Sequence, residues 1–318
     1  MATGGASARE PHAVRDLLAA DDPIGLELLA EKLRSSRSRA ADGTWELADF
    51  YATIGATFSA QQGNRQFWIK KQAMVDHWLW AYPHSPTAHL VNATMQLRHA
   101  WNLRGGGITD RDAGRHTDRV SPDKLAVFHS YVEATKIYLL SHKQPASSDP
   151  HWYVLMGMIA HAQRWPVSDV EALFAEAVAR EPLYSDTYFT VVDYYGQGPD
   201  GKTAIELFAR RAIPFTRASE GNGMYARIYW YASRQIFARN IFSDSRVDWN
   251  LMKQGIDDVL AKYPDNSNVN HFAKLACQAK DRDKSAALLK QMKGLPLREV
   301  WTDVTFFRQC AAWSLKAQ

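Results

Sequence analysis

Long stretches of this chain carry apolar side chains at the spacing of an α-helix. Between residues 170 and 178 they recur every three or four positions, which places them on one face of a helix. Similar stripes run over residues 90–101, 125–139 and 249–263. The sequence shows no sustained alternation of apolar and polar residues, which is the pattern typical of a half-buried strand. It therefore predicts an all-α protein in which each helix buries one face against its neighbours.

Prolines and capping residues mark where several helices begin. Ser85-Pro86, Ser121-Pro122 and Asp149-Pro150 each place a side-chain oxygen just before a proline. The oxygen can accept from free amides of the first turn, and proline is tolerated there because its missing N–H would have no partner in the helix. We therefore predict helices that begin near residues 86, 122 and 150. Further helices are expected to begin near residues 23, 44, 66, 186, 202, 223, 247, 267 and 283.

The predicted helices follow one another with short polar links, and small residues recur at positions where we expect the helices to pack, as in Ala172, Ala175 and Ala179. Together with the prolines that end several helices, these features resemble a divergent tetratricopeptide array. The resemblance implies antiparallel helix pairs stacked as a tetratricopeptide-like α-solenoid. In such arrays the concave side offers an extended groove.

Three short segments resemble a second group of proteins. Residues 104–107 (Arg-Gly-Gly-Gly), 149–153 (Asp-Pro-His-Trp-Tyr) and 226–230 (Ala-Arg-Ile-Tyr-Trp) are similar to a bacterial family described as a domain of unknown function. The similarity would cover about residues 20–235 and implies a helical-repeat fold. The family has no established activity, so the resemblance supplies no catalytic residues to carry over to this chain. We expect a flexible N-terminal tail over 1–20, a helical-repeat domain over 21–245, and C-terminal tetratricopeptide-like helix pairs over 246–318 that continue the array.

The composition argues against nucleic acid or a membrane as the partner. The net charge of the 318-residue chain is only +4, whereas a nucleic-acid binder normally has a concentrated basic face. The sequence has no uncharged apolar run long enough to span a bilayer. A local basic cluster over residues 274–293 either meets an acidic partner or is a solvated helix face.

The cysteines and the N-terminus bear on location. Cys277 and Cys310 are the only cysteines, and their spacing matches no zinc or redox motif. A reducing compartment is the simplest interpretation. Residues 1–11 are small and polar and lack the apolar segment of a secretory signal. We therefore expect a cytoplasmic protein.

Motifs for catalysis, metal or cofactor are not recognised in the sequence. The histidines form no His-Glu-x-x-His pair, and there is no Gly-x-Ser-x-Gly elbow. The glycines after Arg104 are not followed by the Lys-Ser or Lys-Thr of a nucleotide loop, so we interpret them as a helix C-cap. We expect a non-enzymatic protein with no cofactor and no bound metal.

A long connection over residues 105–120 carries Arg111, Arg115, His116 and Arg119 among three aspartates. Connections of this length are often functional or disordered. This one is either part of a recognition surface or a solvated connector.

The predicted function is non-covalent binding of a protein or peptide partner in the groove of the array. Aromatic residues make up 12% of the chain, and such residues dominate binding hot spots. Two alternatives stay open: a bacterial immunity or adaptor protein for a secreted toxin, and an enzyme with a site near the 105–120 loop. The candidate groove contacts are Arg104, His151, Tyr153, Arg227 and Trp230.

Overall fold

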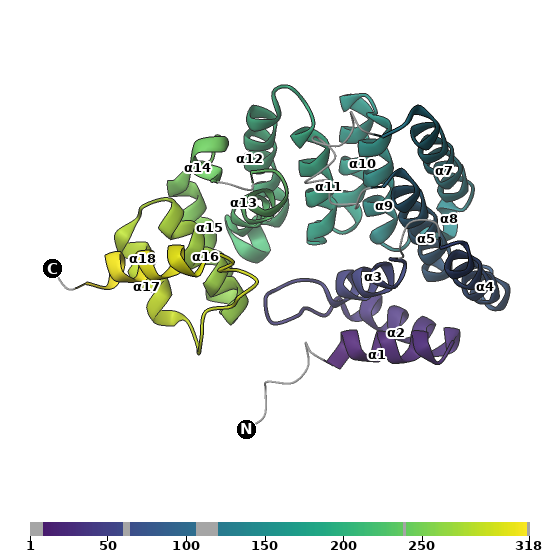
Figure 1. Cartoon of the computed structure of the whole chain (residues 1–318), viewed down its shortest axis with the longest axis horizontal. Helices are drawn as coiled ribbons and strands as arrows, with labels where there is room; N and C mark the ends of the chain where they lie inside the picture. The colour runs from purple at the N-terminus through teal and green to yellow at the C-terminus, as the bar shows by residue number, and fades with distance from the viewer. Residues whose placement is uncertain (1–8, 60–63, 106–119, 238–239, 317–318) are drawn as a thin grey trace. The chain divides into compact units, whose positions relative to one another are not determined.

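The prediction of an all-α protein is confirmed by the computed structural model of the chain (Figure 1). The structure describes residues 9–59, 64–105, 120–237 and 240–316. Within these ranges the regular structure is helical, and β pairing is limited to one isolated antiparallel bridge between Arg39 and Trp45. In the same part of the chain, no helix is both long enough and apolar enough to cross a membrane.

The chain divides into two compact units. The N-terminal unit comprises residues 1–40 and 44–197, and the C-terminal unit comprises residues 41–43 and 198–318. The helices of the N-terminal unit are α1 (Arg9–Ala19), α2 (Pro23–Ser36), α3 (Glu46–Thr57), α4 (Arg65–Ala81), α5 (Pro86–Arg104), α7 (Pro122–Ser141), α8 (Lys143–Ala146), α9 (His151–Gln163), α10 (Val167–Arg180) and α11 (Ser185–Gly196). Those of the C-terminal unit are α12 (Gly201–Glu220), α13 (Gly223–Gln235), α14 (Ile241–Asp244), α15 (Trp249–Lys262), α16 (Asn266–Gln278), α17 (Arg282–Gln291) and α18 (Val304–Leu315).

The boundary between the units falls at residues 197–198 and not at the expected 245–246. The physical reason is packing, because α15 packs directly on α13 and α13 packs on α12. Residues 198–245 therefore belong with the C-terminal helices. Within the N-terminal unit, α5 packs on α7, α7 on α9, and α9 on both α10 and α11 (Figure 1).

Local capping explains why the predicted helix starts agree with the structure. Ser85 accepts a hydrogen bond from the amide of Ala88 at 3.0 Å, and Ser121 accepts one from Lys124 at 3.4 Å. The third predicted start, near residue 150, is the start of α9 at His151. The other nine helices predicted by their starts begin within two residues of the expected position. Helices α1, α8, α14 and α18 were not predicted.

The expected flexible tail over residues 1–20 is wrong for residues 9–19, which form α1. Val14 is only 1% exposed and belongs to the core of the N-terminal unit, with Leu17 and Leu18 packed against that core. These three positions form a short helical stripe that holds α1 against α3. Residues 1–8 lie outside the described residues.

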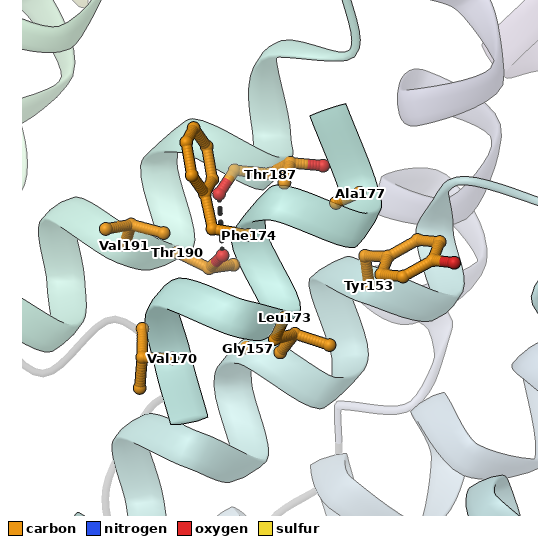
Figure 2. A pocket seen from close by; sticks show the side chains of 9 residues that line it. All are labelled: Tyr153, Gly157, Val170, Leu173, Phe174, Ala177, Thr187, Thr190 and Val191. Carbon is orange, nitrogen blue, oxygen red and sulfur yellow. Dashed lines mark hydrogen bonds between the residues drawn. The ribbon is translucent and has the colours of Figure 1, made fainter. Parts of the chain in front are cut away.

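The stripe over residues 170–178 is buried as predicted. Helix α10 turns Val170, Phe174 and Ala177 toward α9 and α11 (Figure 2). Gly157 on α9 permits this close packing, because a Cβ there would lie 2.5 Å from Oγ1 of Thr190 on α11. The cavity left among these helices has a volume of about 10 Å³, which holds at most one water molecule. It is therefore a packing gap and not a ligand site.

The two cysteines are paired, contrary to the expectation of thiols in a reducing compartment. Cys277 on α16 and Cys310 on α18 form a disulfide, with their Cα atoms 5.9 Å apart. A sequence separation of 33 residues carries no spacing signal, and only tertiary packing brings α18 onto the preceding helices. Disulfides persist mainly in oxidising compartments. The pairing thus removes the argument that the cysteines gave for a cytoplasmic location.

A three-residue segment of the early chain is part of the C-terminal unit. The carbonyl oxygen of Asp42 accepts hydrogen bonds from Arg227 at 3.3 and 3.4 Å and from Asn268 at 3.0 Å. The next residue, Gly43, has a φ of +89°, and a Cβ there would lie 2.4 Å from Nη2 of Arg227. Only glycine fits this turn without strain.

Candidate functional site

A cleft of ligand size lies in the N-terminal unit among α4, α5 and α7. Its volume is about 390 Å³, which is within the usual range for ligand-binding pockets. We call it the α4–α5–α7 cleft. It is lined by Arg65, Trp68, Ile69, Gln72, Met95, Gln96, His99, Leu103 and Tyr131.

Helical spacing explains how these side chains come together. The four lining residues of α4 follow one another at intervals of three, one and three, so they share one face of that helix. Those of α5 lie at 95, 96, 99 and 103 and share one face in the same way. Helix α7 adds Tyr131. The cleft is therefore built on regular helices and not on loops.

Stacked aromatic rings form part of the cleft wall. The Trp68 indole and the His99 imidazole are stacked, with their centroids 4.1 Å apart and their planes inclined by 15°. The Tyr131 ring meets His99 edge-on at 5.1 Å. Burial lowers the pKa of His99 below its ordinary value, so the imidazole is uncharged at neutral pH. The wall thus offers flat, neutral surface for apolar groups.

One polar atom in the wall lacks a partner. The Trp68 side chain is 7% exposed, and its Nε1 is buried without a hydrogen-bond partner. A buried donor without an acceptor is unfavourable. Both polar atoms of the Gln96 side chain, by contrast, have partners within the protein. Its Oε1 accepts a hydrogen bond from Thr135 at 3.1 Å, and its Nε2 donates one to Asn92 at 3.3 Å.

Arg104, the first predicted contact, lies at the end of α5 and outside the cleft lining. Its guanidinium stacks over Trp101 at 4.8 Å and over Phe128 at 5.2 Å. The expected C-cap follows directly, since Gly105 has a φ of +94° and its amide donates to the Trp101 carbonyl at 3.2 Å. Arg104 thus packs on the aromatic rings of α5 and α7.

His151 and Tyr153 are buried inside the N-terminal unit, so the prediction that they contact a partner in an open groove is not supported. The His151 ring stacks on Tyr51 at 4.0 Å, and its Nδ1 lies 3.4 Å from the hydroxyl of Tyr184. Burial, together with the charge of Arg98, lowers the pKa of His151 to about 3. Both rings therefore serve the core.

The hydroxyl of Tyr153 donates a hydrogen bond to Glu176 at 2.8 Å. Burial and this carboxylate raise the pKa of Tyr153 above its ordinary value, so the hydroxyl stays protonated. Tyr153 is also one of the residues that line the small gap of Figure 2. Its polar end thus has a partner within the protein.

Arg227 and Trp230 belong to the C-terminal unit, whereas the other three predicted contacts belong to the N-terminal unit. Arg227 is 7% exposed and forms an ion pair with Glu220 at 3.1 Å, so the prediction of a groove contact is again not supported. Trp230 is half-buried, with its ring 5.4 Å from His271 and under the guanidinium of Arg234 at 5.3 Å.

Asp149 organises the buried polar centre of the N-terminal unit. Its carboxylate accepts from Arg34 Nε at 2.9 Å, from the Tyr51 hydroxyl at 2.7 Å and from the amide of His151 at 2.9 Å. Arg34 also donates to Thr87 at 2.6 Å. The segment over residues 149–153 is therefore explained by packing and hydrogen bonding in the core.

None of the five predicted contacts lines the cleft. The sequence signal that could have indicated the cleft is the run from Arg65 to Gln72. Trp68 and Ile69 share one helical face with these two polar residues, which lie at the ends of the run. Most of the 105–120 connection, including Arg111, Arg115, His116 and Arg119, lies outside the described residues. The alternative of an enzyme site there stays a prediction.

Comparisons with models of known protein families, with curated proteins and with solved structures find no match. The tetratricopeptide-like resemblance therefore stays a prediction, and no residue role is transferred to this chain from another protein.

Proposed function

We propose that this protein is a non-enzymatic binding scaffold whose N-terminal unit takes up an apolar side chain of a protein or peptide partner in the α4–α5–α7 cleft. The observation that carries this proposal is a 390 Å³ cleft with a stacked aromatic wall. Its helices pack in sequence along the chain, which is compatible with a tetratricopeptide-like arrangement and supplies a rigid base.

The chemistry of the wall supports a peptide as the occupant. The rings of Trp68, His99 and Tyr131 offer neutral apolar surface. An apolar side chain of a peptide suits such a surface. Ile69 is 50% exposed at the cleft and gives the partner further apolar contact area. Aromatic anchors in such pockets typically carry much of the binding energy.

The test uses the full chain and a library of random peptides displayed on phage. Enriched peptides are synthesised, and their affinity is measured by fluorescence anisotropy for the wild type and for Ile69→Asp. A carboxylate at this position places charge against the apolar wall, and we expect binding to weaken at least about tenfold. Ile24→Asp is the matched control, since Ile24 is 59% exposed on α2 and does not line the cleft.

Two results would refute the proposal. One is a library selection that enriches no apolar peptide above background. The other is an enriched peptide that binds Ile69→Asp and Ile24→Asp as tightly as it binds the wild type, which would place its site elsewhere on the chain.

A further inference from the structure

Arg98 on α5 is a half-buried cationic group for which the described residues supply no counter-charge. The side chain is half-buried, and its Nε is sealed from solvent without a hydrogen-bond partner. Among residues 9–59, 64–105, 120–237 and 240–316, no carboxylate forms an ion pair with Arg98. Burial lowers the pKa of Arg98, and no acidic group offsets that effect.

Other arginines of this chain that are withdrawn from solvent have partners. Arg34 pairs with Asp149 at 2.9 Å, and Arg227 pairs with Glu220 at 3.1 Å. A guanidinium that loses its water without gaining an anion is strongly destabilising. Arg98 thus differs from these two arginines, and a charge without a counter-charge is a candidate for a site that a ligand completes.

The surroundings of Arg98 hold the guanidinium but do not neutralise it. Gly55 on α3 lies against it, since a Cβ at Gly55 would be 3.2 Å from Nη2 and 3.4 Å from Nε. The methyl group of Thr94, one turn earlier on α5, faces the same point at 3.5 Å. His151 is near enough for the Arg98 charge to depress its pKa, but a neutral imidazole supplies no negative charge. The neighbours are therefore apolar or uncharged.

We propose that Arg98 binds an oxyanion of a ligand, either a carboxylate or a phosphate group. The planar guanidinium matches both groups, because its parallel N–H donors can meet two oxygens at once. Arg98 does not line the α4–α5–α7 cleft. The oxyanion site is therefore independent of the proposed peptide site, and either can fail without the other.

The test measures the melting temperature and the ion affinity of the full chain. Inorganic phosphate and acetate are the probes, and sodium chloride at matched ionic strength controls for screening. We compare the wild type with Arg98→Met and with Arg15→Met, which removes an exposed arginine of α1. Phosphate or acetate should raise the melting temperature of the wild type and of Arg15→Met. In Arg98→Met the rise should vanish, with affinity about ten- to a hundredfold weaker by calorimetric titration.

The two probes separate the two kinds of ligand. A rise with phosphate alone points to a phosphorylated ligand, and a rise with acetate alone points to a carboxylate. In sodium chloride, Arg98→Met should be at least as stable as the wild type, because an unpaired buried charge is removed. A marked loss of stability would show that Arg98 already has a partner in the chain and would overturn the proposal. The proposal also fails if neither phosphate nor acetate raises the melting temperature of the wild type more than chloride does. It fails likewise if the melting temperature of Arg98→Met rises as much as that of the wild type.

Discussion

Replacing Asp149 with alanine should be among the most damaging single changes in the N-terminal unit. The carboxylate is fully buried and accepts three hydrogen bonds, from Arg34, Tyr51 and the amide of His151. Its removal leaves the Arg34 guanidinium, whose side chain is 15% exposed, without its buried partner. Loss of one partner from a buried ion pair costs about 3–5 kcal/mol. That is a large fraction of the about 5–15 kcal/mol that stabilises a typical folded protein.

The matched control is Glu181→Ala, which breaks an ion pair of the same chemistry in the same unit. Glu181 lies 2.6 Å from Arg37, whose side chain is 63% exposed. Water replaces the lost contact there, so the expected cost is below about 1 kcal/mol. Asp149→Asn keeps a carbonyl acceptor but loses the charge, and its cost should fall between the other two.

Urea unfolding of the full chain, followed by circular dichroism, gives the free energies. Hydrogen exchange measured by mass spectrometry then locates the effect. Peptides covering α9 should exchange about a hundredfold faster in Asp149→Ala, since about 3 kcal/mol corresponds to roughly that factor. Equal destabilisation by Asp149→Ala and Glu181→Ala would refute the assignment of Asp149 as the centre of a buried network.

Three further outcomes are expected. The pKa of His151 is about 3 in the folded protein, lowered by burial and by Arg98, and about 6.5 when unfolded, so the unfolded state binds more protons as the pH falls. The free energy of unfolding should therefore drop by about 2 kcal/mol from pH 7 to pH 5 through this group. The urea midpoints of His151→Asn should depend less on pH than those of the wild type. If the variant shows the same pH dependence as the wild type, His151 is not the cause. Reduction of the disulfide by dithiothreitol should lower the free energy of unfolding by about 3–4 kcal/mol, given the length of the loop that it closes. Cys310→Ser should melt at the same temperature with and without reductant. Free thiols detected in the unreduced wild type would contradict the pairing. Phe174→Ala should cost about 3–5 kcal/mol, and exposed Val167→Ala on the same helix less than about 0.5 kcal/mol; the reverse order would mean that the buried face of α10 is misassigned.

The features predicted correctly from sequence are those that a few neighbouring residues determine. Ser85 and Ser121 cap their helices with an oxygen that bonds three residues onward, so a short window contains both partners. The stripe over residues 170–178 is of the same kind. Helix α1 was overlooked because its stripe is brief and lies beside a polar terminus.

The features that sequence reasoning missed depend on partners far along the chain. Tyr153 meets Glu176, and Arg227 meets the carbonyl of Asp42, 185 positions away. The sequence around a charged or aromatic residue does not indicate whether the folded core will supply such a partner. The same holds for Arg98, whose distinguishing property is the absence of a partner among the described residues. Only the three-dimensional structure distinguishes a buried side chain that has its hydrogen-bond partners from one that is available to a ligand.

The segment over residues 41–43 has a consequence for the order in which the chain assembles. This segment is synthesised long before Arg227 and Asn268. The side chains of those two residues donate hydrogen bonds to the carbonyl oxygen of Asp42. The C-terminal unit therefore depends on a segment that is synthesised before the rest of that unit. A fragment starting at Gly198 would lack that acceptor, and supplying the missing residues as a separate peptide should restore part of its stability.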